Sequence, residues 1–156
     1  MIEIKIPAYG DLALEHLVMD YNGTLAVDGE LEPGVKEALR CLSQKLSLHI
    51  ITADTFGKVR SSIEGLDCIL SILAADRQEL GKLEYINRLN PQTVVSIGNG
   101  RNDRLMLAES ALGIAVVLAE GAAMETLRAA DVVCTRIVWA LELLLNPLRL
   151  VATLRS

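Results

Sequence analysis

The stretch EHLVMDYNGTLAVDG, residues 15–29, decides the fold and carries the most informative polar side chains of the chain. Its apolar part belongs to a run from Leu14 to Met19 that has no sustained polar alternation, as is typical of a strand buried on both faces of a parallel sheet. The run ends in DYNGT, residues 20–24, so a carboxylate, a glycine and a hydroxyl follow the strand directly. Asp28-Gly29 then predicts a tight hairpin turn. The stretch therefore predicts a buried strand that delivers Asp20 to one edge of a sheet.

Short apolar runs and helical patterns alternate along the rest of the chain. We expect strands at 2–6 (alone or as half of a hairpin), 14–19, 48–52, 68–73, 93–97, 113–117 and 132–134. Helices are expected at 33–45, 56–63, 77–89, 103–110 and 122–130, and in one C-terminal segment from Arg136. With neither repeat nor linker, this order predicts a single α/β domain over residues 1–156, built on a doubly wound, mainly parallel sheet.

Composition excludes several classes of function. Of the 156 residues, 51% are hydrophobic and only 3% aromatic, and the net charge is −5 without any basic run. A nucleic-acid or anionic-membrane partner is therefore disfavoured. Three widely spaced cysteines predict buried, unpaired thiols and a cytoplasmic protein. The apolar stretch IVWALELLLNPLRLV, residues 137–151, contains Glu, Asn, Pro and Arg, which argues against a membrane span.

Four polar motifs are expected to meet at one edge of this sheet, because ligands of open parallel sheets bind outside the carboxyl ends of the strands. They are DYNGT at 20–24, TAD at 52–54, Lys82 early in a helix, and GNGRND at 98–103. Alone, each motif also fits a turn, a helix cap or a solvated lysine. Together they supply a carboxylate nucleophile, a hydroxyl, a cation and a second carboxylate, which is the set needed to handle a phosphoryl group with Mg²⁺.

In this order the motifs resemble those of the haloacid dehalogenase (HAD) superfamily of phosphoaspartyl-forming enzymes. Within it, the sequence looks like the phosphorylation domain of P-type ATPases and the small soluble proteins described as P-type-ATPase-like. The segment ALGIAVVLAEGAAMETLRAADVVC, residues 111–134, also resembles the ATPase segment after the fourth motif. The resemblance covers about Leu17 to Cys134 and implies a Rossmann-like HAD fold with a small flap hairpin.

The resemblance also implies roles for the matching residues. Asp20 would be the nucleophile, and Lys82 would neutralise charge on it and on the transferring group. Phosphoryl oxygens would be held by Thr52 and by turn amides around Tyr21, Asn22 and Ala53. Mg²⁺ would be bound by Asp20, the backbone carbonyl of Asn22, Asn99 and Asp103, with Asn102 supporting the loop.

Two asparagines depart from the superfamily pattern. Most of its phosphatases have an aspartate as general acid–base where this chain has Asn22, and the loss of such help typically costs ~10²–10⁴ in rate. Poor alkoxide leaving groups suffer most, so ATP-like or acyl-phosphate substrates are favoured over simple phosphomonoesters. Asn99 replaces a metal-binding aspartate, which predicts weakened Mg²⁺ binding in the absence of substrate.

The spacing of the motifs leaves no room for a cap domain. Only 27 residues separate Thr24 from Thr52, and 29 separate Thr52 from Lys82. We therefore expect substrate selection by a macromolecular substrate or a neighbouring subunit, and hence a homo-oligomer acting on a phosphorylated small molecule or macromolecule. The alternative hypothesis is a catalytically attenuated relative that binds phosphate or a partner through the same loops.

Overall fold

The computed structural model describes residues 1–53 and 57–156. The strands are β1 (Ile2–Ile6), β2 (Gly10–Leu14), β3 (His16–Met19), β4 (Ala26–Val27), β5 (Glu30–Leu31), β6 (Ser47–Thr52), β7 (Ile69–Ile72), β8 (Val94–Gly98), β9 (Leu112–Val116) and β10 (Val132–Cys134). The α-helices are α1 (Val35–Leu42), α2 (Val59–Ser62), α3 (Gln78–Leu89), α4 (Arg104–Glu109), α5 (Met124–Ala129), α6 (Ile137–Leu145) and α7 (Pro147–Leu154). The predicted α/β class is confirmed.

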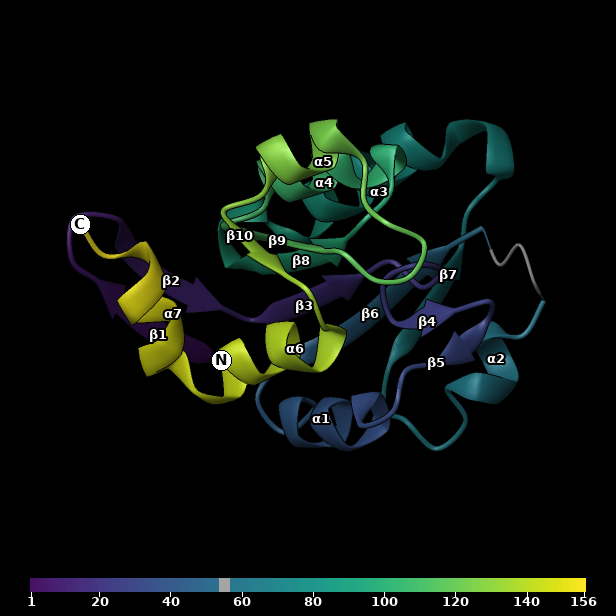
Figure 1. The fold of residues 1–156 in the computed structure, drawn as a ribbon, viewed down its shortest axis with the longest axis horizontal. Coiled ribbons are helices and arrows are strands. Elements are labelled where there is room, and N and C mark those ends of the chain that lie inside the picture. Colours follow the sequence, from purple (N-terminus) through teal and green to yellow (C-terminus); the bar gives the residue numbers. More distant parts are fainter. Residues whose placement is uncertain (54–56) are drawn as a thin grey trace.

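The centre of the molecule is a six-stranded sheet in the order β10-β9-β8-β3-β6-β7, in which every neighbouring pair is parallel. Helices α3, α4 and α5 lie on one side of it and α1 and α6 on the other, as expected of a doubly wound sheet (Figure 1). Side chains of β3 alternate between the two layers: Leu17 and Met19 belong to one apolar cluster and Val18 to the other.

Two small hairpins accompany this sheet. The first, β1–β2, is a separate antiparallel pair that extends beyond the sheet and lies beside α7 (Figure 1). Leu14 therefore ends the hairpin rather than beginning the central strand, which corrects the predicted run from 14 to 19. The second, β4–β5, is the predicted flap, and its turn has positive φ angles at Asp28 and Gly29.

Helix ends depart from the prediction where local chemistry overrides the apolar pattern. The single helix expected from Arg136 is two helices, α6 and α7, bent by 101°. Pro147 cannot continue the first helix and restricts Asn146 to a non-helical backbone (φ −125°, ψ 71°). Helix α1 ends at Leu42 rather than near residue 45, and α2 has only four residues, while the start predicted for it at Phe56 lies outside the described residues.

The cysteine prediction holds only in part. All three thiols are free, but Cys41 is exposed and the other two are half-buried. Helix α1 buries the side chains of Val35, Ala38, Leu39 and Leu42, and Cys41 lies on the opposite face of the same helix.

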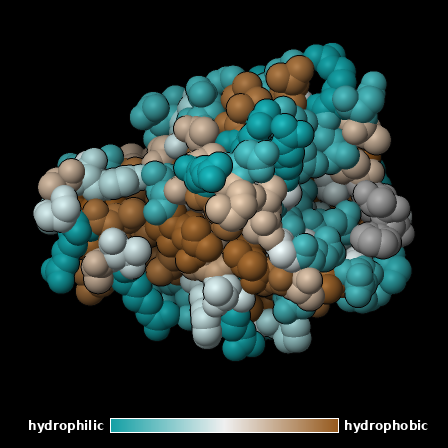
Figure 2. All heavy atoms as spheres, turned by 45° about the horizontal axis from the view of Figure 1, so that its top comes forward, coloured by the Kyte–Doolittle hydropathy of each residue, from teal (hydrophilic) through white to brown (hydrophobic). Residues whose placement is uncertain are grey.

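The surface is divided by polarity. Figure 2 shows hydrophobic residues gathered around the hairpin and the C-terminal helices, whereas the end that carries the flap is mostly hydrophilic. Among the described residues no single helix has both the length and the apolar character needed to cross a bilayer, although α6 and α7 together match such a span by length and composition.

Candidate active site

The strand order places the predicted motifs around one point of the sheet. From β3 the chain first builds β6 and β7 on one side, and then crosses through α3 to β8 on the other. The carboxyl ends of β3 and β8 therefore flank a topological switch point, where open α/β sheets form their binding crevice. Asp20 follows β3 and Asn99 follows β8, while Thr52 ends the neighbouring strand β6.

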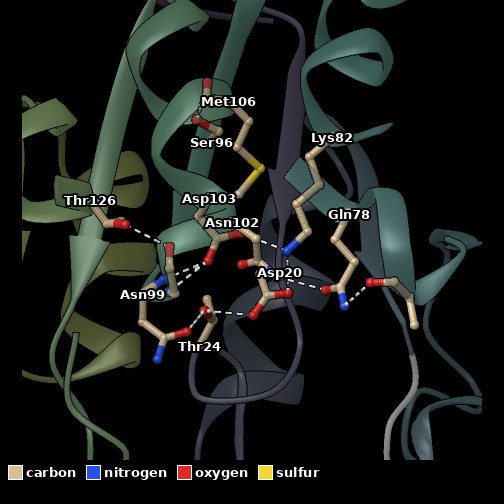
Figure 3. A network of polar contacts seen from close by, with 12 residues as sticks. Asp20, Thr24, Gln78, Lys82, Ser96, Asn99, Asn102, Asp103, Met106 and Thr126 are labelled. Atoms are coloured by element: carbon tan, nitrogen blue, oxygen red, sulfur yellow. Dashed lines mark hydrogen bonds and ion pairs between the residues drawn. The ribbon is translucent and has the colours of Figure 1, made fainter. Parts of the chain in front are cut away.

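A buried lysine joins the two carboxylates of the site (Figure 3). The Nζ of Lys82 lies 2.7 Å from Oδ1 of Asp20 and 2.6 Å from Oδ1 of Asp103. Lys82 and Asp103 are fully buried, and Asp20 is 7% exposed. Buried charges persist only when they are paired and hydrogen-bonded, so the triad is a specific arrangement rather than a surface ion pair.

Burial and charge act in opposite directions on these groups. Burial raises the pKa of the Asp20 carboxyl to about 6, although Lys82 and the Thr24 hydroxyl act to lower it. For Lys82, burial acts to lower the pKa, but the carboxylates of Asp20 and Asp103 outweigh it and the pKa is raised. Asp20 is therefore predominantly a carboxylate at pH 7, as a nucleophile must be, and Lys82 is a permanent cation.

The loop after β8 is folded around Asp103. Its Oδ2 accepts hydrogen bonds from the backbone amides of Asn99 at 2.9 Å and Gly100 at 2.8 Å. The fit is close at Gly98, where an added Cβ would lie 2.5 Å from the Asp103 Cγ. Thr126 of α5 donates to the carbonyl of Gly100 at 2.6 Å and fixes the same loop from outside. The GNGRND motif is thus a rigid support for one carboxylate.

Asn99 is oriented by two contacts. Its Nδ2 donates to the carbonyl of Gly121 at 3.0 Å, which turns its Oδ1 toward Thr24. The Thr24 Oγ1 lies 3.1 Å from this oxygen and 3.2 Å from Oδ2 of Asp20, and its single proton serves one of the two at a time. Gly23 permits the approach: its φ is +77°, and a Cβ there would lie 2.4 Å from the Asn99 Nδ2.

A pocket of about 260 Å³ opens at this point. It is lined by Asp20, Asn22, Thr52, Ala53, Gln78, Asn99, Gly100, Asn102 and Glu120. Six residues with predicted roles thus share one pocket, Gly100 of the fourth motif lines it as well, and Lys82 and Asp103 are buried beside Asp20. The Tyr21 side chain is directed elsewhere, since its hydroxyl donates to the carbonyl of Gly29 in the flap, so only its backbone can serve the site. Asp54 of the TAD motif lies outside the described residues.

Two lining residues were missed by the sequence reasoning, Gln78 and Glu120. Gln78 stands one helical turn before Lys82 on α3, and its Oε1 accepts from the Nδ2 of Asn102 at 2.6 Å. The i, i+4 spacing from the predicted lysine was a usable signal. Glu120 follows β9, whose carboxyl end meets the same edge of the sheet, so the rule that located the other motifs also applied there.

One buried polar atom of the pocket is unsatisfied. Among the described residues, the Oδ1 of Asn22 is the buried side-chain oxygen or nitrogen without a hydrogen-bond partner. Leaving a buried acceptor unpaired costs about 1–3 kcal/mol, so this oxygen is available to a donor brought by a ligand or by water.

The oxygen donors of the pocket fit a hard divalent cation. Asp20, the carbonyl of Asn22 and the Oδ1 of Asn99 belong to three residues that line one pocket, and Mg²⁺ prefers such oxygen ligands. The Oδ2 of Asp103 accepts hydrogen bonds from two backbone amides. Its Oδ1, which accepts from Lys82, is therefore the Asp103 oxygen that could bind a metal. In the described part of the chain no cluster of three or more His, Cys, Asp or Glu residues offers another metal site.

Sequence comparisons identify two relatives from one archaeon. The uncharacterized protein MJ0073 of Methanocaldococcus jannaschii is 40% identical over 93 residues, covering 54% of this chain and 100% of the relative. The uncharacterized protein MJ0072 of the same organism is 44% identical over 39 residues, covering 25% of this chain and 89% of the relative. No family model matches the sequence.

Solved structures share the fold. The 3-deoxy-D-manno-octulosonate 8-phosphate phosphatase of Moraxella catarrhalis, in complex with magnesium, phosphate and KDO, aligns with a TM-score of 0.71 at 19% identity, covering 85% of this chain and 86% of that chain. A putative HAD hydrolase of Legionella pneumophila aligns with a TM-score of 0.70 at 20% identity, covering 90% and 87%. The catalytic domain of the CPx-ATPase CopB-B aligns with a TM-score of 0.57 at 23% identity, covering 73% of this chain and 45% of that chain. The predicted capless HAD fold is confirmed.

Proposed function

Because the chain belongs to the same family as MJ0073 and has the fold of the HAD superfamily, we propose that it is a Mg²⁺-dependent phosphohydrolase or phosphotransferase that acts through a phospho-aspartate at Asp20. Lys82 neutralises charge on the nucleophile, and Thr52 with the amides of the first motif holds the phosphoryl oxygens. Mg²⁺, bound by Asp20, the Asn22 carbonyl, Asn99 and Asp103, supplies charge neutralisation between carboxylate and phosphate when it is present.

The observation that carries this proposal is the Asp20–Lys82–Asp103 triad beside an open polar pocket. A lysine that is fully buried between two carboxylates is costly to maintain for stability alone, since buried ion pairs often contribute little or nothing to it. Perturbed and partnered titratable groups in a cleft are typical of functional sites. Here the cleft also holds the hydroxyl of Thr52 and the amide of Asn99.

The proposed substrates are phosphoanhydrides such as ATP, or acyl phosphates. Their leaving groups depart as stable anions without a proton, and the pocket has an asparagine, Asn22, where a proton donor would be needed for an alkoxide. The shared fold of the CopB-B catalytic domain supports the ATP-like substrates.

The test is phosphoenzyme formation with acetyl [³²P]phosphate or [γ-³²P]ATP in the presence of Mg²⁺. We expect an acid-stable, hydroxylamine-sensitive label on the wild type and none on Asp20→Asn. Asp67→Asn is the matched control, because Asp67 is exposed and precedes β7, so it lies at the opposite edge of the sheet. Absence of label on the wild type, or equal labelling of Asp20→Asn, contradicts the proposal.

A second candidate is an attenuated protein that binds phosphate or a partner without turnover. The unsatisfied Oδ1 of Asn22 favours it, because this side chain can accept a hydrogen bond but cannot transfer a proton. Asn22→Asp separates the two candidates. A gain of phosphatase activity of ~10²-fold or more indicates a competent but slowed enzyme, whereas phosphate binding by equilibrium dialysis without any gain supports the binding protein.

We also propose that the protein forms a homo-oligomer and that its substrate is a phosphorylated small molecule or macromolecule. Between β3 and α3 the described residues contain only the flap, α1, β6, α2, β7 and a 3₁₀ turn at Ala75–Arg77, so no cap domain shields the pocket there. A neighbouring subunit supplies such a shield. Light scattering coupled to size-exclusion chromatography measures the mass directly, and a monomer of 16.9 kDa contradicts this part of the proposal.

A further inference from the structure

The loop between β9 and α5, residues 117–123, is anchored beside the pocket. A tight turn closes it, with the amide of Gly121 donating to the carbonyl of Leu118 at 2.9 Å. Asn99 holds it twice: its side chain donates to the Gly121 carbonyl at 3.0 Å, and its own carbonyl accepts from the amide of Ala123 at 2.9 Å. Glu120 lies within the turn, directly before the anchored Gly121, so the backbone fixes its place at the rim of the pocket.

The Glu120 side chain faces both the pocket and the flap. It lines the same pocket as Asp20 and Asn22, and its Oε1 accepts a hydrogen bond from the backbone amide of Asp28 at 3.4 Å. The loop that carries it extends toward β4 of the flap (Figure 1). Glu120 is exposed, so its carboxylate is in reach of solvent water as well as of the pocket.

Among the nine described residues that line the pocket, only Asp20 and Glu120 have ionisable side chains. Asp20 is the nucleophile of the proposed function and is occupied once it carries a phosphoryl group. Lys82 and Asp103 are fully buried and bonded to each other at 2.6 Å, so neither faces an incoming water. Asn22, at the position where a general acid–base would stand, cannot accept a proton.

We infer that Glu120 is the general base for hydrolysis of the phosphoenzyme at Asp20, in place of the group missing at Asn22. The inference rests on the proposed function. In this step the oxygen of a water attacks phosphorus, and the bond between phosphorus and the Asp20 carboxylate breaks with its electron pair remaining on Asp20. The proton of the water passes to a Glu120 carboxylate oxygen and from there to solvent, which leaves inorganic phosphate. General-base help of this kind contributes ~10²–10⁴ in rate.

The experiment measures formation and decay of the phosphoenzyme separately. Wild type, Glu120→Gln and Glu109→Gln are labelled with acetyl [³²P]phosphate and Mg²⁺, excess reagent is removed, and the loss of label is followed. Glutamine keeps an oxygen that can accept from the Asp28 amide, so the flap contact survives while proton transfer is lost. Glu109 is exposed at the end of α4 and serves as the control for charge removal.

We expect equal rates of label formation for all three proteins and a decay that is ~10²-fold slower or more for Glu120→Gln alone. In the double variant Asn22→Asp/Glu120→Gln, decay recovers, because a carboxylate has returned to the pocket beside Asp20. Label on the wild type with an unchanged decay in Glu120→Gln overturns the inference and leaves the proposed function intact. Slower labelling with unchanged decay also overturns it, since that result indicates a positioning role. Absence of label on the wild type contradicts both the proposed function and the inference about Glu120.

Discussion

Replacing Lys82 by methionine tests whether the buried triad has the energetic character that its geometry implies. The substitution keeps most of the length and the apolar stem of the side chain, and it removes the charge and the N–H donors that Asp20 and Asp103 share. Both carboxylate oxygens lie within 2.7 Å of the same nitrogen, so they are at most about 5.3 Å apart. At that separation and an effective dielectric constant of about 20, two like charges repel by about 3 kcal/mol. Breaking a buried pair by removing one partner typically costs about 3–5 kcal/mol, which agrees.

The assay is urea unfolding of Lys82→Met against the wild type at several pH values. With a slope of about 2 kcal/mol per molar urea, a loss of about 3 kcal/mol lowers the midpoint by about 1.5 M at pH 7. The pKa of Asp20 is about 6 with Lys82 present, and removing the lysine raises it further. Above pH 6 the folded variant therefore binds more protons than the folded wild type, and the loss grows by up to about 1.4 kcal/mol per pH unit. Below pH 6 the Asp20 carboxyl is protonated in both folded proteins, so the loss levels off at its smallest value.

Arg88→Met is the matched control on the same helix. Arg88 is 76% exposed and pairs with Glu84 at 3.8 Å, so its removal is expected to change stability by no more than about 0.5 kcal/mol. If Lys82→Met unfolds at the same midpoint as Arg88→Met, or if its loss does not change with pH, then the triad does not hold two charged carboxylates and Asp20 is not an ionised nucleophile.

Two further predictions concern the turn of the first motif, which follows β3, and a buried histidine of the neighbouring strand β6. In Gly23→Ala the new Cβ sits at a residue with positive φ and lies 2.4 Å from the Asn99 Nδ2, whereas the control Gly65→Ala has positive φ but no atom within 4 Å of the new Cβ. Calorimetric titration should therefore show weakened Mg²⁺ binding for Gly23→Ala alone. Equal Mg²⁺ affinities of the two variants would refute the role of Asn99. Burial, and then the charge of His16, lowers the pKa of His49 to about 4. Since the unfolded chain takes up this proton near pH 6.5, stability should fall by up to about 3 kcal/mol as the pH drops from 6.5 to 4. His49→Gln should lose that part of the slope in urea unfolding, and parallel curves would show that His49 does not titrate this way.

The sequence could predict which residues gather at the site because a parallel sheet imposes it. Side chains after parallel strands meet at one edge whatever the details of packing, so the sequence alone groups Asp20, Thr52 and Asn99. The sequence could not predict that Lys82 is fully buried, because a lysine early in a helix is ordinarily solvated and only the packing of α3 against the sheet decides otherwise. Pro147 indicated a helix break after Asn146, but the apolar run across these two residues suggested one continuous helix.

The two asparagines that looked alike in the sequence differ in kind in the structure. The fold depends on the Asn99 amide, because its Nδ2 donates to the carbonyl of Gly121, which can only accept. An aspartate at this position would place two acceptors about 3.0 Å apart and would loosen the loop that carries Glu120. The fold does not depend on the amide oxygen of Asn22, because this buried Oδ1 has no hydrogen-bond partner among the described residues. Returning an acid at position 99 therefore disturbs the architecture, whereas an acid at position 22 adds chemistry to a pocket that already accommodates it. The amide at 99 supports the loop, whereas the amide at 22 leaves that position of the pocket without a group that can transfer a proton.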